Sequence, residues 1–369
     1  MEKKGVSLQE RDRRWANIRR EMAQRGLDGL IVVSDGHVER RGAMRYVADV
    51  GAAVMYHYVV FPLKGEPIGI NLKGGWIKNI KPLPLRGGWV PESGPYAPVI
   101  ADAIKELNME KGNIGIEGEI EWDFIPSPVY QRLVKDLPKA TLKPSTIIHE
   151  LKRVKSPEEL KFIEEWAENV DKACETCFKF AKPGTTENEI SSEMCRQFYQ
   201  MGMEDIHGFP LPRSTRILNP GDNVLLYPET QGPGGYWLHF GRMLAFKKPK
   251  KEVQDLWDFC LQAQKRGVEK LRPGNTGGDV MKAVNEALKG TPYIGSARGS
   301  GHGMGLDVLE KPFITFDDET VLKTNMTIGL HAILGSSTVP MYVQIADTYI
   351  ITDGEPRILS KIPKEIKVL

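Results

Sequence analysis

A nine-residue pattern that recurs in similar form is the strongest constraint on the fold of this 369-residue chain. Residues 182–190 read KPGTTENEI, and ninety residues later residues 272–280 read RPGNTGGDV. In each copy the Pro-Gly pair can end one helix and a threonine can cap the next. The repeat therefore predicts a duplicated helix–turn–helix plus sheet unit, whose two halves would face each other across a cleft.

The first 145 residues alternate between helix-like and strand-like patterns. Residues 9–26 place Trp15, Ile18 and Met22 on one face of an amphipathic helix. A further helix is expected at residues 99–107, and strands are expected at residues 27–34, 56–62, 67–72 and 113–117. Strands that alternate with helices predict an α/β layer domain.

A domain boundary is expected near residue 150. Ser156 is a good helix N-cap, Pro157 fits the first helical position, and the two glutamates that follow suit the positive helix start. A long helix should run from there to about residue 182. We therefore expect an α/β (α+β) protein with two domains, residues 1–150 and residues 151–369.

Composition excludes several classes of partner. A hydrophobic content of 41%, a charged content of 27% and a net charge of +2 are ordinary for a globular protein, so neither nucleic acid nor a membrane is expected as a partner. No apolar run reaches the roughly 18 residues of a membrane span, and the N-terminus leads into a charged helix, so a cytoplasmic location is expected. Cys174 and Cys177 lie in a helix-like run without a second pair, which favours ordinary buried thiols.

The candidate chemistry lies in four stretches of the second domain. Residues 219–229 read as a turn into a buried strand, and residues 235–243 read as the returning strand of a hairpin. Residues 301–306 are rich in glycine, which allows close backbone approach to a ligand and should leave the imidazole of His302 exposed. Residues 325–331 and 343–348 read as two further strands.

These stretches resemble the pita-bread (M24) superfamily of creatinases, prolidases and aminopeptidases P. The shared motifs come in the family's order and rough spacing: Lys155-Ser156-Pro157-Glu158-Glu159, Pro220-Gly221-Asp222, Gly235-Tyr236, Arg242 and Gly301-His302-Gly303-x-Gly305. The resemblance implies a creatinase/prolidase-like N-terminal domain, a C-terminal pita-bread catalytic domain with an internal pseudo-twofold repeat, and a homodimer.

The resemblance also implies a metal site, but with altered ligands. Peptidases of the family hold two metal ions with two aspartates, one histidine and two glutamates. These five positions fall here on Tyr227, His239, His302, His331 and Ala346. Because no carboxylate remains to bridge two ions, a dinuclear hydrolytic centre is not expected. The three histidines could instead hold one divalent transition metal (Fe, Zn, Mn, Cu or Ni), or they could be metal-free pocket residues, as in creatinases.

Six other residues are candidates for catalysis or substrate binding. His207, Tyr227 and Glu229 are the catalytic candidates, because a histidine near neutral pKa or an acidic group at the hairpin could move protons. Arg242, Arg45 and Gln344 are the substrate-binding candidates. Each has a structural alternative: Arg242 could brace the hairpin, Arg45 could lie in a solvated loop, and Gln344 could orient a ligand imidazole or simply lie at a strand edge.

The main functional hypothesis is a non-peptidase enzyme that acts on a small polar or carboxylated molecule. It would be a hydrolase or lyase that cleaves a C–N or C–C/C–S bond, with acid/base histidines at a mononuclear three-histidine metal site. The alternatives are an Xaa-Pro peptidase-like metallohydrolase, a metal-free creatinase-like amidinohydrolase and a catalytically inactive binding module.

Overall fold

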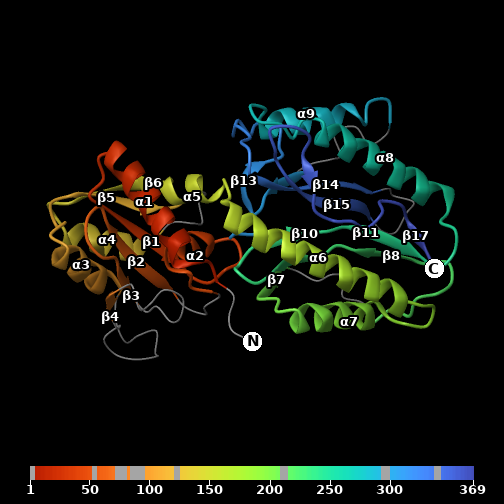
Figure 1. The fold of residues 1–369 in the computed structure, drawn as a ribbon, viewed down its shortest axis with the longest axis horizontal. Coiled ribbons are helices and arrows are strands. Elements are labelled where there is room, and N and C mark those ends of the chain that lie inside the picture. The colour runs from red at the N-terminus through yellow and green to blue at the C-terminus, as the bar shows by residue number, and fades with distance from the viewer. Residues whose placement is uncertain are drawn as a thin grey trace. The chain divides into compact units, whose positions relative to one another are not determined.

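The computed structural model describes residues 5–51, 56–70, 81–83, 96–119, 125–207, 215–291, 300–335 and 342–369. The chain divides into two compact units, Met1–Lys152 and Arg153–Leu369 (Figure 1). Residues 71 and 72, the end of the strand predicted at residues 67–72, lie outside the described residues. Among the described residues, no helix is long and apolar enough to cross a membrane.

The first unit is the predicted α/β layer. Its sheet has the strand order β4-β3-β2-β1-β5-β6, in which β1 runs antiparallel to β2 and parallel to β5. Side chains of α3 and α4 share a core with one face of the sheet, whereas Trp15 of α1 packs edge-on against Phe61 on the other face. The elements are α1 (Leu8–Gln24), β1 (Gly29–Ser34), α2 (Gly42–Ala48), β2 (His57–Pro62), β3 (Ile68–Ile70), β4 (Lys81–Leu83), α3 (Tyr96–Glu106), β5 (Asn113–Glu117), α4 (Ser127–Asp136), β6 (Thr141–Ser145) and α5 (Ile147–Lys152).

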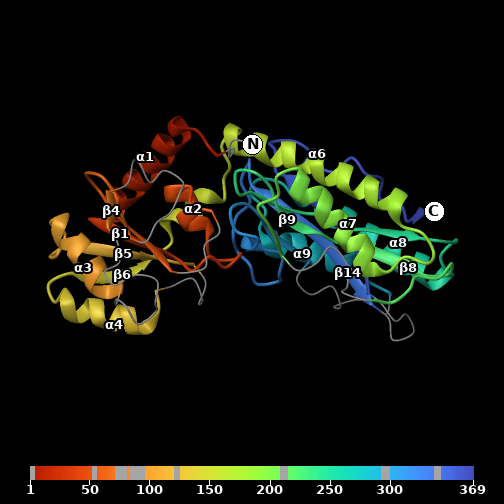
Figure 2. The same cartoon turned by 90° about the horizontal axis from the view of Figure 1, so that it is seen from below.

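The internal repeat of the second unit is present as two helix pairs. The helices α6 (Pro157–Phe180) and α7 (Glu187–Gln200) form the first pair, and α8 (Lys251–Val268) and α9 (Gly277–Glu286) form the second. Gly184 and Gly274 both have positive φ in the linking turn, and Thr186 and Thr276 both cap the following helix in a capping box. In Figure 1 the strands of this unit lie between the two pairs, and Figure 2 shows α6 and α7 from the outside.

The strands of the second unit form three sheets in the described residues. Their orders are β10-β9-β7, β17-β11-β8 and β13-β12-β14-β15-β16. The strands are β7 (Asp205–His207), β8 (Asn223–Leu226), β9 (Glu229–Gln231), β10 (Trp237–His239), β11 (Arg242–Ala245), β12 (Gly301–Gly303), β13 (Glu310–Phe313), β14 (Thr327–Gly335), β15 (Tyr342–Ile350), β16 (Arg357–Ile358) and β17 (Lys367–Val368).

The predicted hairpin of residues 219–243 is more complex than expected. Both of its arms break, so that β8 pairs with β11 in one sheet while β9 pairs with β10 in another. Pro228 lies at the break of the first arm, where it has no N–H to donate to a ladder. At the break of the second arm Gly241 pairs with Ala346 of β15, and a Cβ at Gly241 would lie 2.7 Å from the backbone nitrogen of Ala346. As a result, β9 and β10 lie beside strands β12 and β14, which carry His302 and His331.

The structure corrects the solvated-loop alternative for Arg45. This residue lies in helix α2 rather than in a loop, and its side chain is only 2% exposed. Its Nε lies 2.9 Å from Asp49 Oδ1, one helical turn later. The contacts of Arg45 are thus those of a buried ion pair within the first unit.

Candidate metal centre

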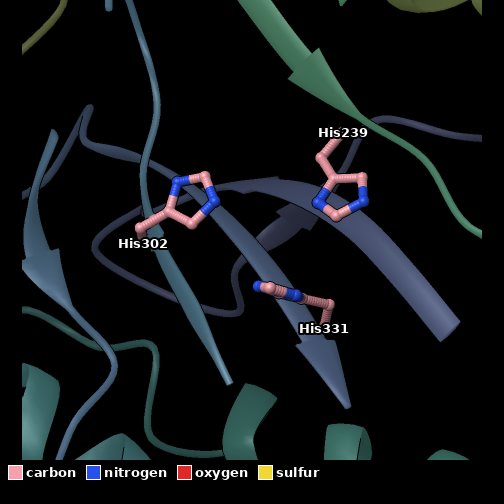
Figure 3. Close-up of side chains that lie close together, drawn as sticks. All are labelled: His239, His302 and His331. Carbon is pink, nitrogen blue, oxygen red and sulfur yellow. The ribbon is translucent and has the colours of Figure 1, made fainter. Parts of the chain in front are cut away.

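Three histidines from three strands converge in the second unit. His239 ends β10, His302 is central in β12 and His331 is central in β14. One ring nitrogen from each lies within 4.8 Å of one from each of the others. The ring of His331 lies 5.0 Å from that of His239 and 5.6 Å from that of His302, nearly perpendicular to the latter. Figure 3 shows the three rings around a common space.

Strand register explains how two of these histidines come together. His302 pairs with Gly329, and His331 is two residues further along β14, so both side chains lie on the same face. Ala346 lies directly opposite His331, where its methyl group leaves room for the imidazoles. A Cβ at Gly329 would approach Met304 Sδ to 2.7 Å, so that the methionine side chain would have to shift, and it would contact the Cβ of His239 at 3.6 Å.

Glu229 joins the third histidine to the site. In the sheet β10-β9-β7, Glu229 pairs with His239 on one side and with His207 on the other. Its Oε1 lies 3.2 Å from His239 Nδ1 and 3.5 Å from His302 Nε2, and its Oε2 lies 3.9 Å from His207 Nε2. The acidic group that faces the histidines is therefore Glu229, and not the neighbouring Tyr227 on which the family's first aspartate falls by sequence.

The electrostatics of the cluster favour an ionised Glu229 and neutral imidazoles at His239 and His331. Burial alone would raise the pKa of Glu229, but the adjacent His239, His302 and His207 outweigh it and hold that pKa well below its ordinary value. Burial lowers the pKa of His239, against the opposing effect of Glu229. Burial, with the two neighbouring imidazoles, lowers the pKa of His331 well below 6.5. Neutral imidazole is the form that binds a metal.

The ring nitrogens fit a bound cation. His302 Nδ1 lies 3.1 Å from the carbonyl of Gly303, which can only accept, so Nδ1 carries the proton and the Nε2 lone pair faces the cluster. Both ring nitrogens of His331 are buried, and no hydrogen-bond partner reaches either within the described parts of the chain. A buried polar group without a partner is costly, and coordination of a metal ion would remove that cost.

The site fits one metal ion and not the family's pair of ions. Three imidazoles and one carboxylate suit a divalent transition metal such as Zn²⁺ or Fe²⁺. Two ions would need bridging carboxylates, and Glu229 is the carboxylate that the described residues place against the histidines. The donor set therefore differs from the one that the resemblance implies for peptidases.

Two other predicted residues are held by the protein itself. Arg242 is buried, and its five N–H groups are matched by five acceptors: the carbonyls of residues 241, 346, 362 and 363, and Asp347 Oδ1 at 2.7 Å. These contacts match the alternative in which Arg242 braces the hairpin. The amide of Gln344 lies 3.2 Å from His239 Nε2, which matches the alternative in which it orients an imidazole. Arg45 belongs to the other unit.

Sequence reasoning missed two features of the site. Thr348 accepts a hydrogen bond from the backbone N–H of His239 at 3.0 Å and lies 3.1 Å from its carbonyl, which fixes the end of β10. The signal was available, since residues 344, 346 and 348 alternate along β15 and share one face. His302 was expected to be exposed, but it is 6% exposed, and its ring lies against His331 and Glu229.

Comparison with known proteins places the chain among hydrolases. The model of Metallopeptidase family M24 matches residues 161–353, more than half of the chain. An Xaa-Pro dipeptidase from Pyrococcus furiosus is 27% identical over 287 residues, which cover 72% of this chain and 78% of the relative. Ectoine hydrolase from Halomonas elongata is 21% identical over 396 residues, which cover 96% of each chain.

Solved structures share the fold along nearly the whole chain. Dipeptidase PepE from Mycobacterium ulcerans aligns with a TM-score of 0.81, 20% identity and 99% coverage of each chain. An Xaa-Pro dipeptidase from Bacillus anthracis aligns with a TM-score of 0.79, 22% identity and coverage of 97% of this chain and 100% of the other. The metallopeptidase family match and the Xaa-Pro dipeptidase from Pyrococcus furiosus favour the peptidase-like alternative over the main hypothesis of a non-peptidase enzyme. The fold is the expected pita-bread arrangement, and the chain belongs to metallopeptidase family M24.

Proposed function

We propose that this chain is a metal-dependent hydrolase that cleaves an amide C–N bond in a small substrate, with Xaa-Pro dipeptides as the first substrate class. The observation that carries the proposal is the convergence of His239, His302 and His331 around one space beside an ionised Glu229. Family membership supports hydrolysis rather than the lyase reaction.

The three histidines would hold one divalent transition metal. Such an ion polarises a carbonyl group and lowers the pKa of a water molecule towards neutrality. His302 is already oriented for this role by the carbonyl of Gly303, and the backbone of His239 is fixed by Thr348. Because these two histidines are already held in place, less of their side-chain and backbone freedom has to be lost when the ion binds.

Glu229 and His207 are the groups that would move protons. Oε2 of Glu229 points towards His207, whose side chain is 40% exposed at the edge strand β7. A histidine that reaches solvent beside this carboxylate can take a proton from water and pass it outward. Tyr227, half-buried just before β9, remains a candidate donor near the same strand.

The test combines metal analysis with a substrate panel. Protein purified without chelator should contain close to one transition-metal ion per chain, and it should hydrolyse Xaa-Pro dipeptides after the same ion is added. His302→Ala and His331→Ala should each lose the ion and the activity, whereas His149→Ala, in the first unit, should keep the ion. Two ions per chain, or full activity in a metal-free sample, would contradict the proposal.

One relative indicates a second substrate class that should be included in the substrate panel. Ectoine hydrolase matches 96% of this chain, and its name describes hydrolysis of a molecule that is not a dipeptide. Small cyclic and acylated amino acids should therefore be tested beside dipeptides. Turnover of these compounds without turnover of Xaa-Pro dipeptides would show that the substrate is a non-peptide amide.

We further propose that the protein is a cytoplasmic homodimer, as the family resemblance implies. Sedimentation equilibrium should give about twice the 41.4 kDa mass of the chain. A single species at the monomer mass across the micromolar range would remove the dimer from the proposal.

A further inference from the structure

The space between Glu229 and two of the histidines brings acceptor atoms face to face. The Nε2 lone pair of His302 points into the cluster, because Nδ1 gives its proton to the carbonyl of Gly303. Oε1 of Glu229 lies 3.5 Å from this lone pair. It also lies 3.2 Å from His239 Nδ1, yet no directed hydrogen bond joins them. Two acceptors this close repel each other unless a proton or a metal ion lies between them.

These distances match the edges of a metal coordination shell. Zinc–nitrogen and zinc–oxygen bonds of about 2.0–2.2 Å in a tetrahedron place neighbouring ligand atoms about 3.3–3.6 Å apart. The separations of 3.2 Å and 3.5 Å from Oε1 fall close to that range. A carboxylate that only orients a ligand histidine would lie at the outer nitrogen, and the outer Nδ1 of His302 is held by Gly303 instead.

The outer nitrogen of His239 is also held. Its Nε2 lies 3.2 Å from the side-chain nitrogen of Gln344, and a half-turn of the amide group would place the amide oxygen there instead. If the amide oxygen of Gln344 accepts a proton from Nε2, then Nδ1 of His239 is left with its lone pair towards Glu229. Gln344 would thus decide which nitrogen of His239 faces the ion, as a positioning residue.

We propose that Glu229 is the fourth ligand of a mononuclear His239–His302–His331–Glu229 centre, bound through Oε1, with Gln344 holding the Nε2 proton of His239. This inference rests on the proposed function and assigns that site's ligand set. Oε2 then stays unbound and faces His207, so one carboxylate links the ion to a residue that reaches solvent. An N₃O set with one negative charge selects a transition metal over Mg²⁺ or Ca²⁺.

The decisive experiment is a Co²⁺ titration of metal-free protein, read by visible absorption and by calorimetry. Wild type should bind one Co²⁺ with the d–d bands of a site that has four protein ligands and a fifth position for water. Glu229→Gln should bind Co²⁺ more than about 100-fold more weakly, which exceeds the usual cost of losing an outer-shell partner, and its bands should shift. Glu229→Asp keeps the charge with a shorter reach and should fall between the two.

The controls distinguish an incorrect assignment of Glu229 as the fourth ligand from the absence of the metal centre itself. Glu175→Gln, an exposed glutamate on α6, should bind Co²⁺ like wild type. If wild type binds no Co²⁺, the proposed metal centre itself fails. If wild type binds Co²⁺ and Glu229→Gln has the same affinity and spectrum, only the fourth ligand is overturned. Circular dichroism of each variant shows whether a loss reflects misfolding.

Gln344 allows an independent check of the ligand geometry. Gln344→Glu is close in shape and can only accept at neutral pH, so it should bind Co²⁺ at least as tightly as wild type. Gln344→Leu removes the acceptor and should weaken binding by about 10- to 100-fold, without the change of spectrum that loss of a ligand produces. Weaker binding by Gln344→Glu would show that the amide donates to His239, and would overturn the assignment of Nδ1.

Discussion

At the scale of single residues, the site depends on small side chains as much as on its histidines. Ala346 lies opposite His331, and Gly329 lies opposite His302, so the positions that flank the imidazoles carry little or no side chain. A pocket of this kind cannot be found from the histidines alone, because the alanine and the glycine have no chemistry of their own. Their role follows from register, which fixes the side chains that share a face.

Gly329→Ala should disturb the site without removing any polar group. The new Cβ would lie 2.7 Å from Met304 Sδ and 3.6 Å from the Cβ of His239. We expect a loss of about 1–3 kcal/mol in the free energy of unfolding, as is usual for overpacking, together with weaker metal binding. Urea unfolding and a Co²⁺ titration measure the two effects. Gly221→Ala is the matched control because a Cβ there meets nothing within 4 Å; equal losses in both variants would contradict this argument.

Arg242 should behave as a structural residue rather than a substrate ligand. Its removal leaves Asp347, which is 0% exposed, without the guanidinium that lies 2.7 Å away. Breaking a buried ion pair costs about 3–5 kcal/mol, so Arg242→Ala should unfold at much lower urea concentration. Arg266→Ala, which breaks the exposed pair with Glu269, should cost at most about 1 kcal/mol. A stable Arg242→Ala variant with only a raised KM would restore the substrate-binding role.

At the scale of elements, the capped helices were predictable and the broken hairpin was not. Ser156, Thr186 and Thr276 are N-caps that follow from local hydrogen bonding, and all three form capping boxes. The break near Pro228 depends instead on contacts between strands distant in sequence, such as the pairing of Gly241 with Ala346. For this reason the sequence names Glu229 only as a proton-transfer candidate, while the family's first aspartate falls on Tyr227, two residues before it.

The N-terminus of helix α5 gives the first unit a dependence on pH. Glu117 of β5 is buried, and it accepts hydrogen bonds from the backbone N–H groups of Ile148 and His149 and from the hydroxyl of Ser145. Burial outweighs these donors and raises the pKa of Glu117 from 4.5 to about 8. Between these two values the native state keeps a proton that the unfolded state has lost, so the free energy of unfolding should fall as the pH rises from about 4.5 to 8.

Glu117→Gln should remove this pH dependence from the first unit. The amide oxygen can still accept from the helix N-terminus, and the hydroxyl of Ser145 can accept from the new NH₂ group. Urea unfolding at pH 5 and at pH 8 should show the variant gaining stability relative to wild type at the higher pH. The control is Glu66→Gln, at an exposed position, which should follow the wild-type profile. A wild-type stability that rises over this range, matched by the variant, would contradict the assignment.

At the scale of the whole molecule, metal binding should slow amide hydrogen exchange in one of the two units and leave it unchanged in the other. All four proposed ligands lie in the unit Arg153–Leu369, and the unit Met1–Lys152 contributes none of them. A ligand that binds only the folded state stabilises it by about 2.7 kcal/mol at 100 times its Kd. Amide hydrogen exchange should therefore slow in β10, β12 and β14 when Co²⁺ is added, because these strands would have to separate before the ion could leave.

Strand β1 and its partners β2 and β5 provide the internal reference for this measurement, since they form the centre of the other unit's sheet. Their exchange should be the same with and without Co²⁺, and His331→Ala should show no response in either unit. Equal slowing in both units would mean that the ion binds elsewhere or that the chain unfolds as one cooperative body. A response confined to β10 and β12 would indicate that His331 on β14 faces the substrate rather than the metal, which leaves an open coordination position on that side.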